Sequence, residues 1–468
     1  MGNISNAASM RLLMVIAWFI FWAADSAAQV SFQKSFGAEG YEKGSALKQL
    51  HDGGFIIAGE SDKSFGSQES DMLLIRTDAG GNVMWGATYG GPEREVINDV
   101  VQTLDRGFLF VAEKYQPNKT EGEFLTLGKT DESGNLLWKK IFDEGGNETE
   151  GFAMAATPDG AYIITGIVKN MNVVSSAFFT MTGEDQSVYL LKADGNGNKL
   201  WSRKLNASSS HNISTTGASV TVASDGSYII AGNVTKKGRT DKKIEKPVEN
   251  VNADDARNLL LVKVKPDGSL AWAKEYRAGR ITAGFSVIEK REGGFAVAGI
   301  ATQAGDKGEN VDIFLISMAA DGSILWAKTF GGEKFESVAE VKQAADGGFV
   351  ISGTTTSISD GINDALLFKT DNNGNLLWSK AYGGSGFEYA TQIVLTPDGI
   401  VMTGESSSLP SESFDALLLK TDLNGNSRCK GADIPLSSAN FQLSASDMEK
   451  AETSGVEQGI TPPNFKKA

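Results

Sequence analysis

The chain has 468 residues and a formal net charge of −14, from 44 basic and 58 acidic side chains. A surface of that sign repels phosphate backbones, so nucleic acid is excluded as an expected partner. A hydrophobic content of 41% is that of a protein with a buried core.

The first 28 residues are typical of a secretory signal peptide. Arg11 supplies a positive charge, residues 12–24 are an apolar run, and Ser26-Ala27-Ala28 offers small side chains for cleavage before Gln29. The alternative, a membrane anchor, needs a longer apolar run to span a bilayer. Cys429 is the only cysteine, so no intrachain disulfide is possible. We expect a secreted bacterial protein of the periplasm or cell surface, without a membrane span.

Tryptophan recurs along the chain at the end of one repeated phrase. The phrase is an acid-rich turn, Gly, a polar residue, two variable residues and Trp, as in Asp131-Glu-Ser-Gly-Asn-Leu-Leu-Trp138. The tryptophans that close it are Trp85, Trp138, Trp201, Trp272, Trp326 and Trp378. Such self-similarity indicates a repeat fold. A Trp at a fixed place in every repeat is expected to fill the gap between repeats rather than to bind a ligand.

Each repeat is expected to hold four short strands, A to D in chain order. In the clearest copy they lie within residues 338–382, and Gly, Asp and Asn turns separate them. Strands B and C are apolar on both faces, as in Phe349-Val-Ile-Ser-Gly, so one such sheet cannot be stable alone. Stacking the sheets around an axis buries both faces. The pattern predicts an all-β fold, a seven-bladed β-propeller over residues 29–430 with four antiparallel strands per blade.

The two ends of the chain are expected to differ. Phe32 stands in a Trp slot of an isolated strand D, so the N-terminal strand should complete the last blade and close the ring. Residues 431–468 are rich in Ser, Glu, Lys, Ala and Pro and are expected to form a disordered tail.

The repeat resembles the bacterial secreted β-propeller repeats often called SBBP-type. The phrases that carry the resemblance are Tyr382-Gly-Gly, Thr396-Pro-Asp-Gly, Gly404-Glu-Ser-Ser and Lys420-Thr-Asp. It implies fold and secretion, and little about activity. The Gly-x-x-x-Trp phrase is more weakly similar to quinoprotein propellers, which hold a quinone and calcium on their axis. No residues here match that site.

The loops predict where a ligand could bind. The A–B and C–D turns are short and uniform, whereas the B–C and D–A connections vary and share the opposite face, where binding is usually built. The variation gathers over blades 3 to 5. The candidate binding residues there are Phe178, Phe179, Lys236, Lys242, Arg277 and Arg280. Indel drift in solvated loops is the alternative.

One position recurs just before each strand A and suggests a ring around the channel mouth. It holds Glu42, Glu95, Thr149, Thr215, Thr282, Glu336 and Glu388. The carboxylates Glu42, Glu95, Glu336 and Glu388 could bind a cation or polyol. The alternative is that each side chain caps the backbone of its own D–A loop. The Asp-x-x-Gly-Asn turns lack the ligands of a calcium loop, and Asp and Asn simply suit tight turns.

No catalytic set is apparent. The histidines, His51 and His211, are far apart, and neither a nucleophile triad nor a zinc-type cluster is present. We expect a monomeric binding scaffold for a protein or glycan, without a cofactor; a cation at the channel mouth is the alternative. The alternative is a carbohydrate-active hydrolase or lyase with acidic residues near the axis.

Overall fold

The computed structural model describes residues 31–37, 40–62, 70–91, 93–116, 122–145, 147–175, 180–206, 213–236, 256–302, 311–357, 362–408, 413–427, 431–448 and 452–455. Every element among them is a β-strand. None of these residues belongs to a helix that is long and apolar enough to cross a membrane. The predicted signal peptide, residues 1–28, lies outside the described residues.

The strands follow one another in antiparallel units of four. The first three units are β2 (Tyr41–Gln49) to β5 (Val83–Tyr89) through β3 (Phe55–Asp62) and β4 (Asp71–Thr77); β6 (Glu95–Gln102) to β9 (Leu136–Phe142) through β7 (Phe108–Gln116) and β8 (Gly122–Thr130); and β10 (Glu148–Ala156) to β13 (Lys199–Asn206) through β11 (Tyr162–Ser175) and β12 (Thr180–Ala193). Neighbouring strands in each unit pair with antiparallel register.

Three further units have the same plan. They are β14 (Ile213–Val222) to β17 (Leu270–Arg277) through β15 (Tyr228–Lys236) and β16 (Ala256–Val264); β18 (Thr282–Glu289) to β21 (Ile324–Gly331) through β19 (Phe295–Thr302) and β20 (Val311–Met318); and β22 (Glu336–Gln343) to β25 (Leu376–Tyr382) through β23 (Phe349–Thr355) and β24 (Asp364–Thr370). The last unit has β26 (Glu388–Thr396), β27 (Gly399–Ser406) and β28 (Asp415–Thr421).

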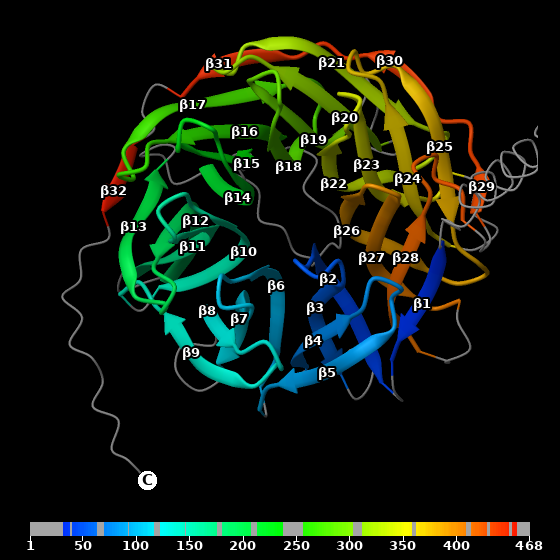
Figure 1. Ribbon diagram of the computed structural model, residues 1–468. Helices are drawn as coiled ribbons and strands as arrows, with labels where there is room; N and C mark the ends of the chain where they lie inside the picture. The colour runs from blue at the N-terminus through cyan, green and yellow to red at the C-terminus, as the bar shows by residue number, and fades with distance from the viewer. Residues whose placement is uncertain are drawn as a thin grey trace, which may run out of the picture.

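The N-terminal strand β1 (Phe32–Phe36) completes this last unit. It pairs antiparallel with β28, from Phe32 opposite Lys420 to Phe36 opposite Ala416. The predicted place of Phe32 is therefore confirmed. Figure 1 shows β1 and β28, from opposite ends of the sequence, side by side in the ring.

Hydrogen bonding groups the strands into six sheets, of four, nine, five, five, four and five strands. The sheet of nine arises because one parallel pair, Thr149 opposite Phe124, joins the unit β6–β9 to the unit β10–β13. The expectation of four antiparallel strands per blade is incomplete, because a strand from the C-terminal segment is added to four of the units.

The units stand around a common centre, in a β-propeller-like arrangement (Figure 1). The first strand of each unit contacts the first strand of the next all the way round: β2 with β6, β6 with β10, β10 with β14, β14 with β18, β18 with β22, β22 with β26, and β26 with β2. The core lies between neighbouring units, since each apolar cluster draws side chains from two of them. This explains why strands B and C are apolar on both faces.

Five of the six repeated tryptophans dock against the C–D turn of the next unit and so fill the gap between units, as predicted. A Cβ added at Gly374 would lie 2.6 Å from the ring of Trp326, and one at Gly425 would lie 2.8 Å from Trp378. The turn approaches this closely because its glycine has no side chain. A tyrosine of the same strand D fixes the turn, since the Tyr382 hydroxyl donates to the Gly425 carbonyl at 2.5 Å.

A second set of contacts links the units near the centre. Each first strand carries a bulge, and in five of the seven the side chain after the bulge accepts a backbone N–H of the next unit. Asp99 Oδ2 accepts from Met154 N at 3.0 Å, and Glu340 Oε2 accepts from Ile393 N at 2.8 Å. Gln392 Oε1 accepts from Leu47 N at 2.9 Å, which ties the last unit to the first.

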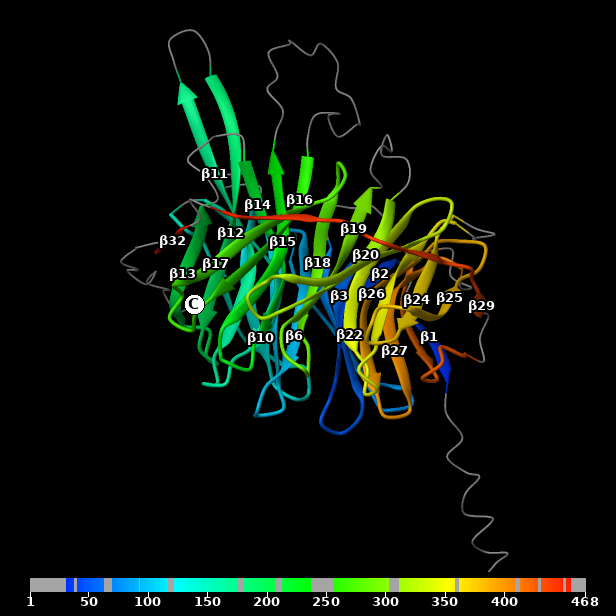
Figure 2. The same cartoon turned by 90° about the horizontal axis from the view of Figure 1, so that it is seen from above.

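The C-terminal segment forms strands in its described part, so the expectation of a disordered tail over residues 431–468 is wrong for residues 431–448 and 452–455. Its strands are β29 (Gly431–Asp433), β30 (Ser437–Asn440), β31 (Ser444–Asp447) and β32 (Glu452–Gly455). They pair with β25, β21, β17 and β13 respectively, so the segment runs backward along the outer rim (Figures 1 and 2). We call residues 431–455 the belt.

Candidate functional site

On the face that carries the A–B and C–D turns, charged side chains form contacts within the protein. Buried lysines of strand C pair with the aspartates of the A–B turns, as in Lys129 with Asp105 at 2.7 Å and Lys420 with Asp398 at 2.7 Å. In the C–D turns the aspartate closes its own loop, because Asp131 Oδ1 accepts the backbone N–H groups of Ser133 and Asn135. These are turn contacts, as predicted, and the side chains are committed to structure.

The four predicted carboxylates lie at the starts of the first strands and are buried: Glu42, Glu95, Glu336 and Glu388. Two of them are held by their own loops, because Glu336 accepts from Gly332 N at 2.9 Å and Glu388 from Gly384 N at 3.0 Å. Such contacts are those expected if each side chain caps the backbone of its own D–A loop.

All four carboxylates have side-chain partners, since Glu336 and Glu388 also accept from the hydroxyls of Thr355 and Ser406, each at 2.8 Å. Glu95 pairs with Lys139 at 2.7 Å and with Lys114 at 3.1 Å. Glu42 accepts from the Ser61 hydroxyl at 3.0 Å. Among the described residues, the carboxylates close enough to hold one metal ion do not include these four.

The predicted patch over the third to fifth units is described only in part. Phe178, Phe179 and Lys242 lie outside the described residues, as does the side chain of Lys236. Arg277 is exposed at the end of β17 and pairs with Glu275 at 2.8 Å, and the backbone N–H of Arg280 donates to Thr302 Oγ1 at 3.1 Å. The B–C connection of the third unit is not a long loop, since β11 and β12 extend it as a hairpin that projects from the ring (Figure 2).

Sequence reasoning missed a set of carboxylates at one position of strand B. Glu60, Glu113 and Glu405 stand at equivalent places in strand B, five residues after the start of β3 and of β7 and six after the start of β27. The signal was the repeated Gly-Glu dipeptide at Gly59-Glu60 and Gly404-Glu405. The three units concerned are neighbours in the ring, since β26 and β27 contact β2, and β2 and β3 contact β6.

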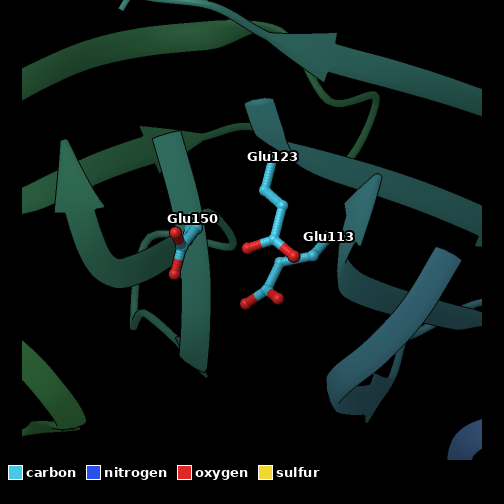
Figure 3. Close-up of side chains that lie close together, drawn as sticks. All are labelled: Glu113, Glu123 and Glu150. Carbon is cyan, nitrogen blue, oxygen red and sulfur yellow. The ribbon is translucent and has the colours of Figure 1, made fainter. Parts of the chain in front are cut away.

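Glu113 is the centre of an acidic cluster between the second and third units. Carboxylate oxygens of Glu113, Glu123 and Glu150 lie within 4.8 Å of one another, and the side chains point together from β7, β8 and β10 (Figure 3). Burial, with the nearby charges of Glu150 and Glu123, raises the pKa of Glu113 to about 8. Burial also raises the pKa of Glu150, against the opposing effect of Lys169. Glu113 is therefore protonated at neutral pH.

Cations and an amide surround the cluster. Lys169 pairs with Glu150 at 2.5 Å, Arg94 pairs with Glu123 at 3.2 Å, and the Asn98 amide donates to Glu113 at 2.6 Å. Carboxylate oxygens at this spacing could ligate a hard cation such as Ca²⁺. The neighbouring cations and the proton on Glu113 reduce the same charge without a metal.

An aromatic patch lies on the same face, where the last unit meets the first. The Phe387 ring lies 5.9 Å from that of Phe414 and 6.4 Å from that of Tyr389, to which it is nearly parallel at 9°. Tyr41 meets Phe414 edge-on at 5.7 Å, and its hydroxyl donates to Glu405 Oε2 at 2.6 Å. All four rings are partly exposed.

Arg94 links the aromatic patch to the acidic cluster. Its guanidinium lies 3.8 Å from Glu60 and 3.2 Å from Glu123. Burial and the Glu405 carboxylate raise the pKa of Tyr41, and the positive charge of Arg94 opposes this shift. A continuous track of rings, carboxyl groups and cations therefore crosses four neighbouring units. We call it the face track; its residues are Tyr41, Glu60, Arg94, Glu113, Glu123, Glu150, Lys169, Phe387, Tyr389, Glu405 and Phe414.

Comparisons with known proteins find distant structural likenesses only. No family model matches the chain, and no curated protein matches it in sequence. Among solved structures, Sqt1 from Chaetomium thermophilum is 10% identical, with 84% of this chain and 99% of that chain covered and a TM-score of 0.33. A puromycin hydrolase is 12% identical, with 78% and 50% covered and a TM-score of 0.44. A glucose dehydrogenase is 9% identical, with 69% and 96% covered and a TM-score of 0.35. Likenesses this distant carry no argument about activity.

Proposed function

We propose that the chain is an exported seven-bladed β-propeller that binds a partner through the face track. The blades are the six complete units and β26–β28 completed by β1, and the pair between Thr149 and Phe124 is a contact between two blades. The signal-like N-terminus and the resemblance to SBBP-type repeats support export to a bacterial periplasm or surface, and we propose a monomer there.

The observation that carries the proposal is the unequal use of the two faces. On the face of the A–B and C–D turns, the polar groups form contacts within turns and between units. On the opposite face, partly exposed aromatic rings lie beside carboxyl, guanidinium and amide groups. Aromatic rings supply apolar contact area at low entropic cost, and a few directed polar groups fix orientation. A glycan offers apolar ring faces and hydroxyls to such a surface, and we propose it as the ligand class ahead of a protein.

The enzyme alternative has less support. Its candidate acids, Glu336 and Glu388, are hydrogen-bonded to their own loops. In the acidic cluster the carboxyl groups are engaged by Lys169, Arg94 and the Asn98 amide. We therefore propose binding without turnover.

A glycan array probed with the mature chain tests the proposal, followed by titration of the best ligand against two variants. Phe387→Ala removes the ring that stacks between Tyr389 and Phe414 and should weaken binding about tenfold. Phe335→Ala is the matched control, because Phe335 precedes Glu336 as Phe387 precedes Glu388 and is 41% exposed. That variant should bind as the native chain does.

The opposite outcome is equally clear. Binding that Phe387→Ala and Arg94→Ala leave unchanged would place the ligand elsewhere on the molecule. Removal of residues 237–255 then tests the patch expected from the variable loops. If a parallel pull-down retained a protein and no glycan, the ligand class would be a protein instead of a glycan, and the proposed site would stay the same.

A further inference from the structure

The belt repeats a short motif, and successive copies of the motif lie on successive blades. Asp433, Asn440 and Asp447 follow one another at seven-residue intervals, and an apolar residue comes directly after each: Ile434, Phe441 and Met448. Each of these apolar residues donates its backbone N–H to the residue that follows a strand D tryptophan. The acceptors are the carbonyls of Ser379, Ala327 and Ala273, at 3.1, 2.9 and 3.0 Å. The belt is thus one linear motif used three times.

Side chains of the motif enter the interfaces between units. Ile434 and Leu436 are buried in the cluster that joins β18–β21 to β22–β25. Phe441 stacks on Phe314 with ring centroids 6.0 Å apart, in the cluster that joins β14–β17 to β18–β21. Asp433 and Asp447 pair with Lys380 and Lys274 of the adjoining strands D. The motif therefore combines a strand ladder, an apolar anchor and an ion pair.

Three outer strands have no such neighbour among the described residues. β1, β5 and β9 each pair on one side only, whereas β13, β17, β21 and β25 pair on both. The difference is visible in equivalent aromatic residues. Tyr276, Phe330 and Tyr382 are buried beside belt strands, whereas Phe36, Tyr89 and Phe142 at the same strand position are only partly buried. Ile141, at the place of the buried Ala381, is 44% exposed.

We propose that the outer edges of β9, β5 and β1 are docking sites for an extended segment of another polypeptide that carries the belt motif. The motif is Asp or Asn followed by an apolar residue, at intervals of about seven residues. The edge continues an interface that the molecule already forms with its own chain, and strand addition to an exposed edge is a common mode of peptide recognition. Lys140 and Lys34 keep the basic position that pairs with Asp433 on β25.

The chain's own belt is not the occupant of these edges. Its four strands are held by β25, β21, β17 and β13, at the high effective concentration of a tethered segment. Beyond the belt, Pro462 and Pro463 lack the N–H groups that a ladder requires. No described strand covers the outer edges of β9, β5 and β1, and we assign them to a segment from a different protein.

A labelled peptide of residues 431–444 serves as the probe, titrated by fluorescence anisotropy against the full mature chain. We expect saturable binding that a peptide with Ile434→Asp and Phe441→Asp does not show. In a strand, the backbone N–H groups of successive residues point to opposite sides. The N–H groups of Ile141 in β9 and Thr88 in β5 therefore point away from the paired strand, toward the open edge. Ile141→Pro and Thr88→Pro should each weaken binding about five- to tenfold, because proline removes one ladder donor.

Two controls separate the possible results. Ile141→Thr keeps the amide and places there the residue type of Thr329 in β21, so it should bind as the native chain does. Far-ultraviolet circular dichroism and the melting temperature show that the proline variants are folded. Phe441→Asp in the protein frees part of its own belt and reports on exchange.

Three outcomes overturn the proposal. The first is the absence of saturable binding. The second is binding that both proline variants leave unchanged and Phe441→Asp in the protein enhances, which would mean that the peptide only replaces the chain's own belt. The third is binding that appears only after residues 456–468 are removed, which would assign the edges to the chain's own C-terminus.

Discussion

Gly374 shows at the scale of single residues how one turn holds two sheets together. Its φ is 73°, a conformation that glycine adopts freely and other residues avoid. The turn also presses on Trp326, so two separate requirements exclude a side chain at this position. Glycines with positive φ recur in the C–D turns, among them Gly134, Gly197 and Gly425, which explains why the turn phrase keeps Gly at a fixed distance before Trp.

Gly374→Ala is expected to lower the free energy of unfolding by about 2–4 kcal/mol, from backbone strain and displacement of Trp326. Gly160→Ala is the matched control. Gly160 has a φ of 79° and no atom within 4 Å of an added Cβ, so only backbone strain of about 1 kcal/mol applies. Urea denaturation of both variants measures the difference. Equal losses would show that the Trp contact contributes nothing to stability.

Glu113 gives a pH dependence of known sign. Because its pKa is raised from 4.5 to about 8, the folded protein binds a proton there that the unfolded chain has already released between those values. This group therefore stabilises the folded state less and less as the pH rises from about 4.5 through 8. Glu113→Gln keeps a neutral side chain at every pH.

The melting temperature of Glu113→Gln should accordingly equal that of the native chain near pH 4.5 and exceed it at pH 9. Glu123→Gln serves as the comparison, since it loses the ion pair with Arg94 and should show no gain of this kind. A Glu113→Gln variant that is no more stable than the native chain at pH 9 would mean that the carboxyl is ionised in the folded protein.

At the scale of elements, the belt differs from the strands of the ring in what stabilises it. Each belt strand has three or four residues and pairs on one side only. Its stability therefore depends on the apolar residue that follows the strand, such as Phe441 after β30. Phe441→Asp should release β30, because an unpaired carboxylate beside Phe314 is unfavourable. Gln442→Asp adds the same charge at an exposed neighbour and should leave the strand in place.

Limited proteolysis and hydrogen exchange at the outer amides of β21 measure this release. Phe441→Asp should increase cleavage within residues 431–448 and speed hydrogen exchange in β21. The melting transition of the four-stranded units should stay unchanged. If cleavage increased equally in Gln442→Asp, the Phe441 ring would not be the anchor.

The same elements show what could be predicted from the sequence. Strands B and C are apolar on both faces and recur with Trp, so the units and the place of β1 were predictable. The belt was not, because Ile434, Phe441 and Met448 stand alone in a stretch of Ser, Ala and Asp, and only the edges of other strands make that stretch a ladder. The face track was missed because Glu405 and Glu60 become neighbours only when the ring closes.

Closure governs the molecule as a whole, since every sheet in a ring is covered on both faces and an opened ring leaves two faces bare. Phe32 is the point to test it. It is 8% exposed and packs against Gly81 in the turn of the first unit, while its strand pairs with β28. An unpaired carboxylate at this position costs several kcal/mol, which is more than a strand of five residues held at one edge can offset.

Phe32→Asp should therefore detach β1, lower the melting temperature, and replace a single unfolding transition by two. The units beside the opening should lose hydrogen-exchange protection first, β27 and β28 on one side and β2 and β3 on the other. Gln33→Asp puts the same charge on the adjacent, partly exposed residue of β1 and should unfold in one transition. A single transition in Phe32→Asp, with protection lost evenly around the ring, would mean that the sheets hold together without the contact of Phe32 at the closure.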